Sequence, residues 1–259
     1  MLRRIAVLSD VHGNLPALQA VLAEPDVRAA ERVVLTGDHA AGPMPVPTLD
    51  ALRDLGGRAL WIRGNADREL VEHRRTGRTT GYPESDWAAR RLRADQVTLL
   101  AGLPDTMELE VDGPGRTLFC HATPRDDEEI VLVDSRAERW AEVMSGVAPE
   151  VETVVCGHTH MPYARVVHGR LVVNPGSVGM PYGRGGAHWA LLGAGGVQLR
   201  RTLYDREAAA ARIVAESGFD GAARWVREYV LGCHPAEAVI DAWGPRDGRP
   251  APERPGDGG

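Results

Sequence analysis

Short apolar runs alternate with amphipathic stretches in the first quarter of the chain. Residues 4–8, 32–35 and 59–62 are apolar runs of strand length, and helical patterns over residues 15–24 and 48–55 separate them. Asn14 is placed to cap the first helix, and Pro16 lies in its first turn, where no amide donor is needed. The order strand, helix, strand, helix, strand predicts a parallel sheet with crossover helices.

The pattern changes after residue 65. Residues 66–101 are mainly helical and polar around a break at 76–81, and we expect this insert to form a lid or specificity element. Further strands are predicted at residues 107–111, 117–120, 153–156, 164–167, 171–174, 188–192 and 197–204, with a helix near 135–144. Helices are then predicted at 206–217, 221–231 and 236–243. The predicted organisation is a main domain over residues 1–204, a helical extension over 205–243 and a disordered tail over 244–259.

Composition limits the partners and the cell compartment that we expect for the protein. The formal net charge of −6 disfavours nucleic acid as a partner, and no apolar stretch approaches the roughly 20 residues of a membrane span. Cys120, Cys156 and Cys233 are an odd number without metal-site spacing, which fits reduced thiols in the cytoplasm. These features leave a monomer and a homodimer equally open.

Potential metal ligands follow five of the predicted strands. They are Asp10, His12, Asp38, Asn65, His121, His158 and His160. Because ligands bind beyond the carboxyl ends of strands in an open α/β sheet, we expect these side chains to converge. Carboxylate oxygens with imidazole nitrogens suit Mn, Fe, Zn, Co or Ni.

Seven ligands exceed the needs of one tetrahedral site. Two ions about 3.5–4 Å apart that share a bridging carboxylate would use them well. Such a pair polarises phosphoryl oxygens and lowers the pKa of a bridging water, which yields a hydroxide poised for in-line attack on phosphorus. The pattern therefore indicates hydrolysis of a phosphate ester.

Several segments together resemble the calcineurin-like metallophosphoesterase superfamily. They are Asp10-Val11-His12-Gly13-Asn14, Gly37-Asp38, Gly64-Asn65-Ala66-Asp67, His121 and Gly157-His158-Thr159-His160. The run Asn174-Pro175-Gly176-Ser177-Val178-Gly179 extends the resemblance to the small bacterial phosphodiesterase branch, over about residues 4–204. The resemblance implies an α/β fold in four layers, α-β-β-α, with two mixed β-sheets flanked by helices.

The resemblance also implies a role for each matching residue. Asp10, His12 and His160 would hold the first of two divalent ions, and Asn65, His121 and His158 the second. Asp38 would bridge the ions, and Asn65 would place its amide near the phosphate. Asp38, Asn65, Asp67 and His121 are thus the expected catalytic residues. Mn²⁺ is the expected metal, with Fe, Zn, Co or Ni as alternatives.

One position departs from the family pattern. Many relatives carry a histidine after the motif asparagine, where it is thought to protonate the leaving group, whereas this chain has Ala66. A well-placed general acid contributes about 10²–10⁴-fold. We therefore hypothesise a substrate with a good leaving group, such as an aryl ester or a nucleotide-like diester, or a proton from another group. His39, which adjoins Asp38, is the candidate for that group.

Substrate contacts are less well defined by the sequence. Arg63 and Arg125 lie beside motif segments and could grip a phosphate through paired hydrogen bonds. Tyr182 and Trp189 could stack on a base, although a structural role is the simpler interpretation. The acidic run at residues 126–129 would disfavour highly anionic substrates.

The sequence thus predicts a phosphodiesterase that acts on a small-molecule phosphate ester such as a nucleotide. A phosphomonoesterase or nucleotide pyrophosphatase would use the same metals and is the alternative enzyme. A non-catalytic scaffold or sensor on the same fold is the alternative outside enzymes, and Ala66 favours it. The complete set of metal ligands argues against it, because a scaffold has no physical need for seven such side chains.

Overall fold

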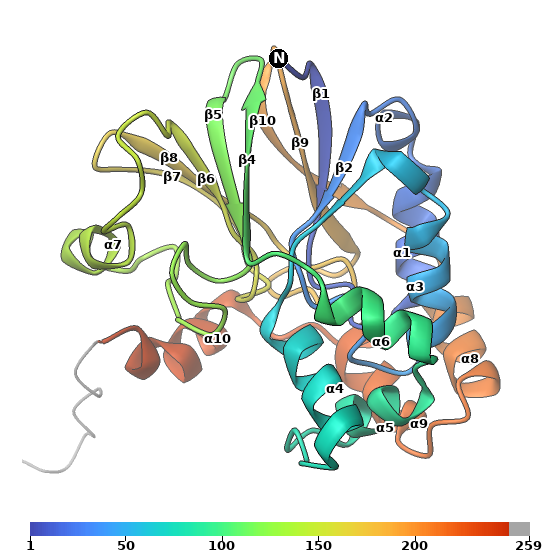
Figure 1. Cartoon of the computed structure of the whole chain (residues 1–259). Helices are drawn as coiled ribbons and strands as arrows, with labels where there is room; N and C mark the ends of the chain where they lie inside the picture. The colour runs from blue at the N-terminus through green and yellow to red at the C-terminus, as the bar shows by residue number, and fades with distance from the viewer. Residues whose placement is uncertain (249–259) are drawn as a thin grey trace, which may run out of the picture.

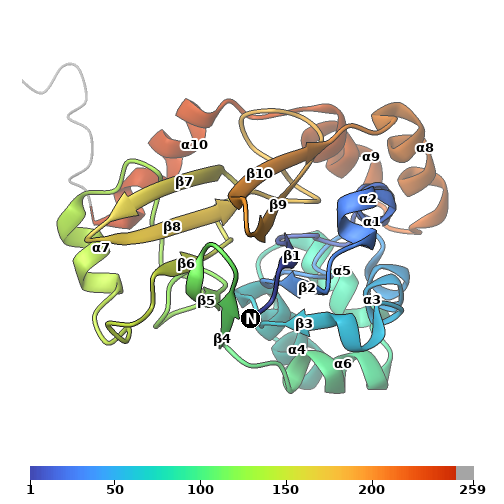
Figure 2. The same cartoon turned by 90° about the horizontal axis from the view of Figure 1, so that it is seen from above.

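The computed structural model of the protein describes residues 1–248 and contains two five-stranded mixed sheets that face each other (Figure 1). The first sheet has the order β10-β9-β1-β2-β3, and the second has the order β4-β5-β6-β8-β7. Helices cover the outer faces of both sheets, as Figure 2 shows for α1 and α3 on one side and α7 on the other. This arrangement confirms the predicted four-layer α/β sandwich.

Each sheet contains three adjacent parallel strands. In the first sheet these strands are β1 (Arg4–Leu8), β2 (Arg32–Leu35) and β3 (Ala59–Trp61), with β3 at one edge. On the other side β9 (Ala187–Gly193) pairs antiparallel with β1, and β10 (Gly196–Thr202) pairs antiparallel with β9 at the edge. In the second sheet they are β5 (Gly115–Cys120), β6 (Thr153–Val155) and β8 (Arg170–Pro175), flanked by antiparallel β4 (Thr106–Val111) and β7 (Pro162–Val167).

Apolar side chains from both sheets fill the space between them, among them Val7 and Val34 from the first sheet and Phe119 and Val155 from the second. Outside the first sheet lie α1 (Leu15–Ala23), α2 (Pro25–Arg28), α3 (Pro45–Arg53) and the short 3-10 helix η1 (Gly56–Arg58). Outside the second sheet lies α7 (Ala137–Val143), whose Trp140 is buried against it. These layers bury most residues of the parallel strands, although β3 is only partly buried.

Local sequence explains where the outer helices begin. The Asn14 side chain accepts a hydrogen bond from the Ala17 amide at 3.2 Å, which caps α1 as predicted. Helix α3 begins at Pro45, three residues before the predicted start. Pro45 and Pro47 both fall in its first turn, where the missing amide hydrogens leave no helical bond unmade.

The insert and the C-terminal helices lie at the same end of the two sheets (Figure 1). The insert consists of α4 (Asn65–Thr76), α5 (Pro83–Arg91) and α6 (Ala94–Ala101), which share an apolar cluster around Leu70 and Leu100. The C-terminal part consists of α8 (Arg206–Glu216), α9 (Ala222–Trp225), the π-helix η2 (Val226–Leu231), α10 (Ala236–Trp243) and the 3-10 helix η3 (Gly244–Asp247). Ile213 and Trp225 pack with Leu15 and Met44, so these helices rest on the sandwich.

The end of the chain differs in part from the sequence-based expectation. Disorder was expected from Gly244 onward, but residues 244–247 form η3, in which Gly244 and Asp247 are buried. The reason is a tertiary contact, because the Ser135 hydroxyl donates a hydrogen bond to the Asp247 carboxylate at 2.6 Å. The rest of the predicted tail, residues 249–259, lies outside the described residues. Within residues 1–248, none of the helices is long and apolar enough to cross a membrane.

Candidate metal centre

The seven predicted ligands all lie just beyond the carboxyl ends of the parallel strands β1, β2, β3, β5 and β6. Five of them have a left-handed backbone, with φ angles of 55° at Asp10, 46° at His12, 56° at Asp38, 64° at His158 and 57° at His160. This conformation costs an ordinary residue about 1–2 kcal/mol. It persists here because neighbouring loops bind one another, as in the 2.9 Å hydrogen bond from the His12 amide to the Asp38 carbonyl.

Three of these residues form a first group, in which Asp10, His12 and His160 place one ligand atom each within 4.8 Å of the others. The Nε2 atoms of His12 and His160 lie 3.1 Å apart, and His160 Nε2 lies 3.2 Å from Asp10 Oδ1. The other carboxylate oxygen of Asp10 accepts hydrogen bonds from Ser9 Oγ and from the His158 amide. Oδ1 is buried and has no hydrogen-bond donor within residues 1–248, which leaves it free to bind a cation.

A second group consists of Asp38, His121 and His158, which meet the same 4.8 Å limit. Asn65 joins this group, because its Oδ1 lies 3.1 Å from His121 Nε2. The two groups share one carboxylate oxygen: Asp38 Oδ2 lies 3.4 Å from His121 Nε2 and 3.6 Å from His12 Nε2. A carboxylate between two ligand groups is the arrangement that a pair of bridged metal ions requires.

Backbone carbonyls fix which nitrogen each histidine can offer. The Nδ1 atoms of His12, His121 and His160 lie 3.2, 2.7 and 2.9 Å from the carbonyl oxygens of Ala41, Thr36 and Met180. A carbonyl only accepts, so each Nδ1 carries the hydrogen and each neutral ring presents its Nε2 lone pair to the centre. His158 is reversed, because its Nε2 faces the Glu128 carbonyl at 3.2 Å and leaves Nδ1 as the ligand atom.

The charges of the second group are strongly coupled. Burial would raise the pKa of Asp38, but the attraction of His121 outweighs it and holds the pKa well below its usual range. Burial would likewise lower the pKa of His121, but Asp38 raises it to about 10. Burial dominates at His158 and lowers its pKa to about 3. The metal-free centre therefore holds an ionised Asp38, a protonated His121 and a neutral His158 at pH 7.

Asp67 lies behind the ligands and organises their loops. Its fully buried carboxylate accepts hydrogen bonds from the amides of Asp38 at 2.9 Å, His39 at 3.0 Å and Gly64 at 3.0 Å. These contacts tie the loop after β2 to the start of α4. They indicate that Asp67 positions these loops, and its predicted catalytic role stays a prediction.

The close approach of these loops explains why glycine occupies position 37. Gly37 has a φ of +101°, and a Cβ atom there would lie 2.5 Å from His121 Nδ1 and 2.7 Å from the Gly64 Cα. Any side chain would push His121 away from the Thr36 carbonyl that orients it. Backbone shape and ligand position are therefore specified together.

A cavity of about 340 Å³ opens over the two groups. Its wall contains ligands from both groups, together with Asn65, Ala66 and the acidic side chains of Glu69, Glu84 and Glu128. Aromatic rings supply another part of the wall, namely Tyr82, Tyr182, Tyr229 and Trp243. One arginine, Arg246, also lines it.

Of these wall residues, the sequence pointed to the ligands, Ala66, Tyr182 and the 126–129 run that contains Glu128. It gave no signal for Glu69, Trp243 or Arg246. Glu69 follows Asn65 by one helical turn, and that spacing could have shown that the two share a face of α4.

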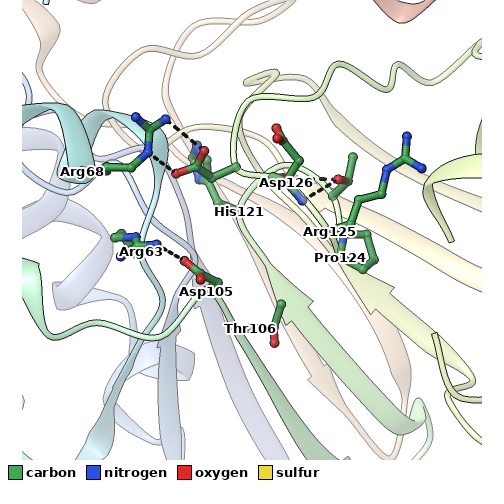
Figure 3. Close-up of a pocket in the computed structure, with 10 residues that line it drawn as sticks. Arg63, Arg68, Asp105, Thr106, His121, Pro124, Arg125 and Asp126 are labelled. Carbon is green, nitrogen blue, oxygen red and sulfur yellow. Dashed lines mark hydrogen bonds and ion pairs between the residues drawn. The ribbon is translucent and has the colours of Figure 1, made fainter. Parts of the chain in front are cut away.

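Arg63 and Arg125 lie in a neighbouring cavity of about 350 Å³, where His121 forms part of the wall (Figure 3). Arg63 forms an ion pair with Asp105, and Arg125 forms ion pairs with Glu129 and Glu142. Both predicted phosphate-binding side chains are therefore already engaged by carboxylates. Figure 3 shows Arg63 directed at Asp105.

Two further side chains considered for the site, His39 and Trp189, are buried away from the cavity. His39 is 1% exposed, and its Nε2 lies 3.1 Å from the Ile62 carbonyl, so the ring does not line the cavity over the ligands. The Trp189 indole donates a hydrogen bond to Thr202 Oγ1 at 3.0 Å within the core. The structure thus brings the seven ligands together and leaves His39 and Trp189 outside the cavity.

Comparison with known proteins assigns the chain to a family. Residues 3–194 match the model of the calcineurin-like phosphoesterase superfamily domain, and the chain belongs to this family. The family and the two buried Asp/His groups together indicate a dinuclear metal site.

Individual proteins resemble this chain in sequence or in fold. The uncharacterized protein MJ0912 of Methanocaldococcus jannaschii is 26% identical over 199 residues, which cover 68% of this chain and 76% of that protein. A metallophosphoesterase from Sphaerobacter thermophilus is 25% identical, with a TM-score of 0.68 over 88% of this chain and 99% of that one. The hypothetical protein PH1004 of Pyrococcus horikoshii OT3 shares the fold, with 21% identity and a TM-score of 0.74 over 89% of this chain and 99% of its own.

Proposed function

We propose that this protein is a dinuclear metal-dependent phosphodiesterase, with Mn²⁺ as the metal to test first. The observation that carries the proposal is the position of Asp38 Oδ2, which lies 3.4 Å from His121 Nε2 and 3.6 Å from His12 Nε2. One buried carboxylate oxygen thus faces both ligand groups. A single-metal site would need only one of them.

The ligand roles follow from the grouping. Asp10, His12 and His160 would hold one ion, Asn65, His121 and His158 the other, and Asp38 both. When bound, the two ions supply a water of lowered pKa and neutralise charge on the phosphate. The Asn65 side chain is oriented by two contacts: its Nδ2 donates a hydrogen bond to Glu69 Oε1 at 3.3 Å, and its Oδ1 faces His121.

The wall of the cavity favours a diester over a monoester. Glu69, Glu84 and Glu128 line the cavity, and they repel a substrate more strongly as its negative charge increases. A phosphodiester carries one negative charge, whereas a monoester carries up to two. The aromatic wall adds a preference for an ester with a flat apolar group, such as an aryl group or a nucleobase.

Ala66 supports a substrate whose leaving group departs without a proton. Its methyl group lines the cavity at the position where many family members present an imidazole. His39 does not reach the cavity, so it does not replace that imidazole. A leaving group of low pKa, such as a nitrophenolate, needs no general acid.

Hydrolysis of bis-p-nitrophenyl phosphate by metal-stripped protein, with and without added Mn²⁺, tests the proposal. His158→Ala is expected to abolish Mn²⁺-dependent turnover. His168→Ala is the matched control, because His168 is an exposed histidine with a similarly positive φ of 48°. p-Nitrophenyl phosphate, run in parallel, separates diester from monoester preference.

Failure would also be informative. No turnover with Mn²⁺, Fe²⁺, Co²⁺, Ni²⁺ or Zn²⁺, despite stoichiometric binding, would refute the proposed activity and favour a scaffold or sensor. Faster hydrolysis of the monoester would refute the diester preference while leaving the metal centre intact.

A further inference from the structure

The last part of the chain that the structure describes lies at one side of the cavity over the metal ligands. Residues 235–248, which we call the C-terminal segment, contain α10 and η3 and lie beyond the family match at 3–194. Two of its side chains, Trp243 and Arg246, line the same cavity as Asp38 and His158. The segment is therefore in a position to contact whatever binds there.

Specific contacts hold the segment in this place. The Trp243 ring meets the His158 imidazole edge-on, with 5.5 Å between the ring centres. Asp247 is 2% exposed and accepts the hydrogen bond from the fully buried Ser135 hydroxyl at 2.6 Å. Arg136 adds a hydrogen bond to the Gly248 carbonyl at 3.2 Å. Because Arg246 directly precedes the buried Asp247, its backbone position is fixed relative to the ligands.

Arg246 differs from the other arginines near the metal centre. Its guanidinium lies 5.5 Å from the centre of the Trp243 ring, and it forms no ion pair with a carboxylate of residues 1–248. Arg63, Arg68 and Arg125 each form such pairs. Among the described residues that line the cavity, Arg246 is the sole basic side chain apart from the ligand histidines.

A guanidinium without a carboxylate partner is well suited to bind phosphate. Its planar fork offers paired hydrogen bonds to two phosphate oxygens, and stacking on an aromatic ring restricts its motion. No ion pair with a carboxylate of residues 1–248 has to break first. Three carboxylates share the wall, so one arginine also limits the repulsion that an incoming phosphate meets.

We propose that Arg246, held by Trp243, binds the phosphate group of the substrate beside His158. This inference rests on the proposed phosphoesterase function for the identity of its ligand. It assigns the C-terminal segment a direct part in substrate binding, supplied from outside the family domain.

Titration of Mn²⁺-loaded full-length protein with inorganic phosphate, followed by calorimetry, tests the proposal without any turnover. Arg246→Ala is expected to weaken phosphate binding about 10- to 100-fold, the usual effect of losing a charged hydrogen bond. Arg246→Lys should recover part of the affinity, because it keeps the charge but lacks the planar fork. Arg224→Ala is the matched control, since the Arg224 side chain is 84% exposed on α9 and does not line the cavity.

Metal content measured on every variant should remain at two ions per chain, because Arg246 contacts no ligand carboxylate. The KM for bis-p-nitrophenyl phosphate should rise in step with the loss of phosphate affinity. Weaker phosphate binding in Arg246→Ala supports the inference even if the wild type hydrolyses no diester, an outcome that would count against the proposed function alone. Equal phosphate affinity in the wild type and Arg246→Ala would overturn the inference, as would failure of the wild type to bind phosphate.

Discussion

Replacing Asp38 with Asn tests the charge coupling at the heart of the proposed metal centre. In the metal-free protein burial would lower the pKa of His121, but Asp38, with smaller contributions from Asp10 and the Thr36 carbonyl, raises it to about 10, a net change of about 5 kcal/mol from the ordinary 6.5. The Asp38 oxygen lies 3.4 Å from His121 Nε2. Coulomb attraction over such a distance is also about 5 kcal/mol at an effective dielectric constant of about 20. The Asp38 carboxylate is therefore the main group that holds the His121 proton against burial.

Without that carboxylate, burial is left as the main influence on His121. Burial favours the neutral ring, so Asp38→Asn should lower the pKa of His121 from about 10 to below 6.5. In the wild type, metal binding must displace the His121 proton. Mn²⁺ affinity should therefore rise about tenfold for each unit by which the pH increases toward 10. The raised pKa also stabilises the metal-free fold fully below pH 6.5, and this stabilisation is lost as the pH rises from 6.5 to about 10.

Nuclear magnetic resonance of the imidazole nitrogens, recorded from pH 5 to 10.5 on metal-free protein, measures the pKa directly. Asp54→Asn is the control, because Asp54 is an exposed carboxylate at the end of α3. Its His121 should titrate as in the wild type. A His121 pKa near 10 in Asp38→Asn, or near 6.5 in the wild type, would refute the coupling.

Three further substitutions test the loops and the leaving-group chemistry. Gly37→Ala should reduce the Mn²⁺ content from two ions to one by displacing His121, whereas Gly56→Ala, with φ +56° and open space around it, should keep both ions; equal contents would contradict this. Asp67→Asn should lower the free energy of unfolding by about 1–3 kcal/mol, and the melting temperature by about 2–4 °C for each kcal/mol. An unchanged calorimetric transition would exclude the positioning role. Ala66→His should increase kcat/KM for phenyl diesters at least about tenfold more than it increases kcat/KM for p-nitrophenyl diesters. An equal change for both substrates would argue against a missing general acid.

The fold and the convergence of the ligands were predictable from local sequence for a topological reason. Each ligand follows an apolar run, and the carboxyl ends of parallel strands meet at one edge of a sheet. Asp10, Asp38 and Asn65 could therefore be placed together before any contact was known. Their assignment to individual ions remains a prediction, because strand order does not determine which side chains share an ion.

Residues outside the motifs could not be placed in this way. Arg63 and Arg125 adjoin motif segments, but the sequence does not show that Asp105 and Glu129 engage them. Arg246 lies in a stretch rich in Pro, Gly and Arg, a composition typical of disorder. Its order depends on the contact between Asp247 and Ser135, which are 112 residues apart. No local pattern encodes a contact of that range.

The net charge around the cavity and the absence of an imidazole at position 66 favour the same kind of substrate. Two divalent ions would bring four positive charges to a centre where Asp10 and Asp38 supply two negative ones, and Arg246 would add one positive charge at the wall. Glu69, Glu84 and Glu128 oppose this excess, although burial raises the pKa of Glu69 and favours its neutral form. The remaining positive charge suits the single negative charge of a diester. A leaving group that departs as an anion must then pass these carboxylates without a proton from position 66, and a delocalised phenolate-like anion does so more readily than a localised alkoxide.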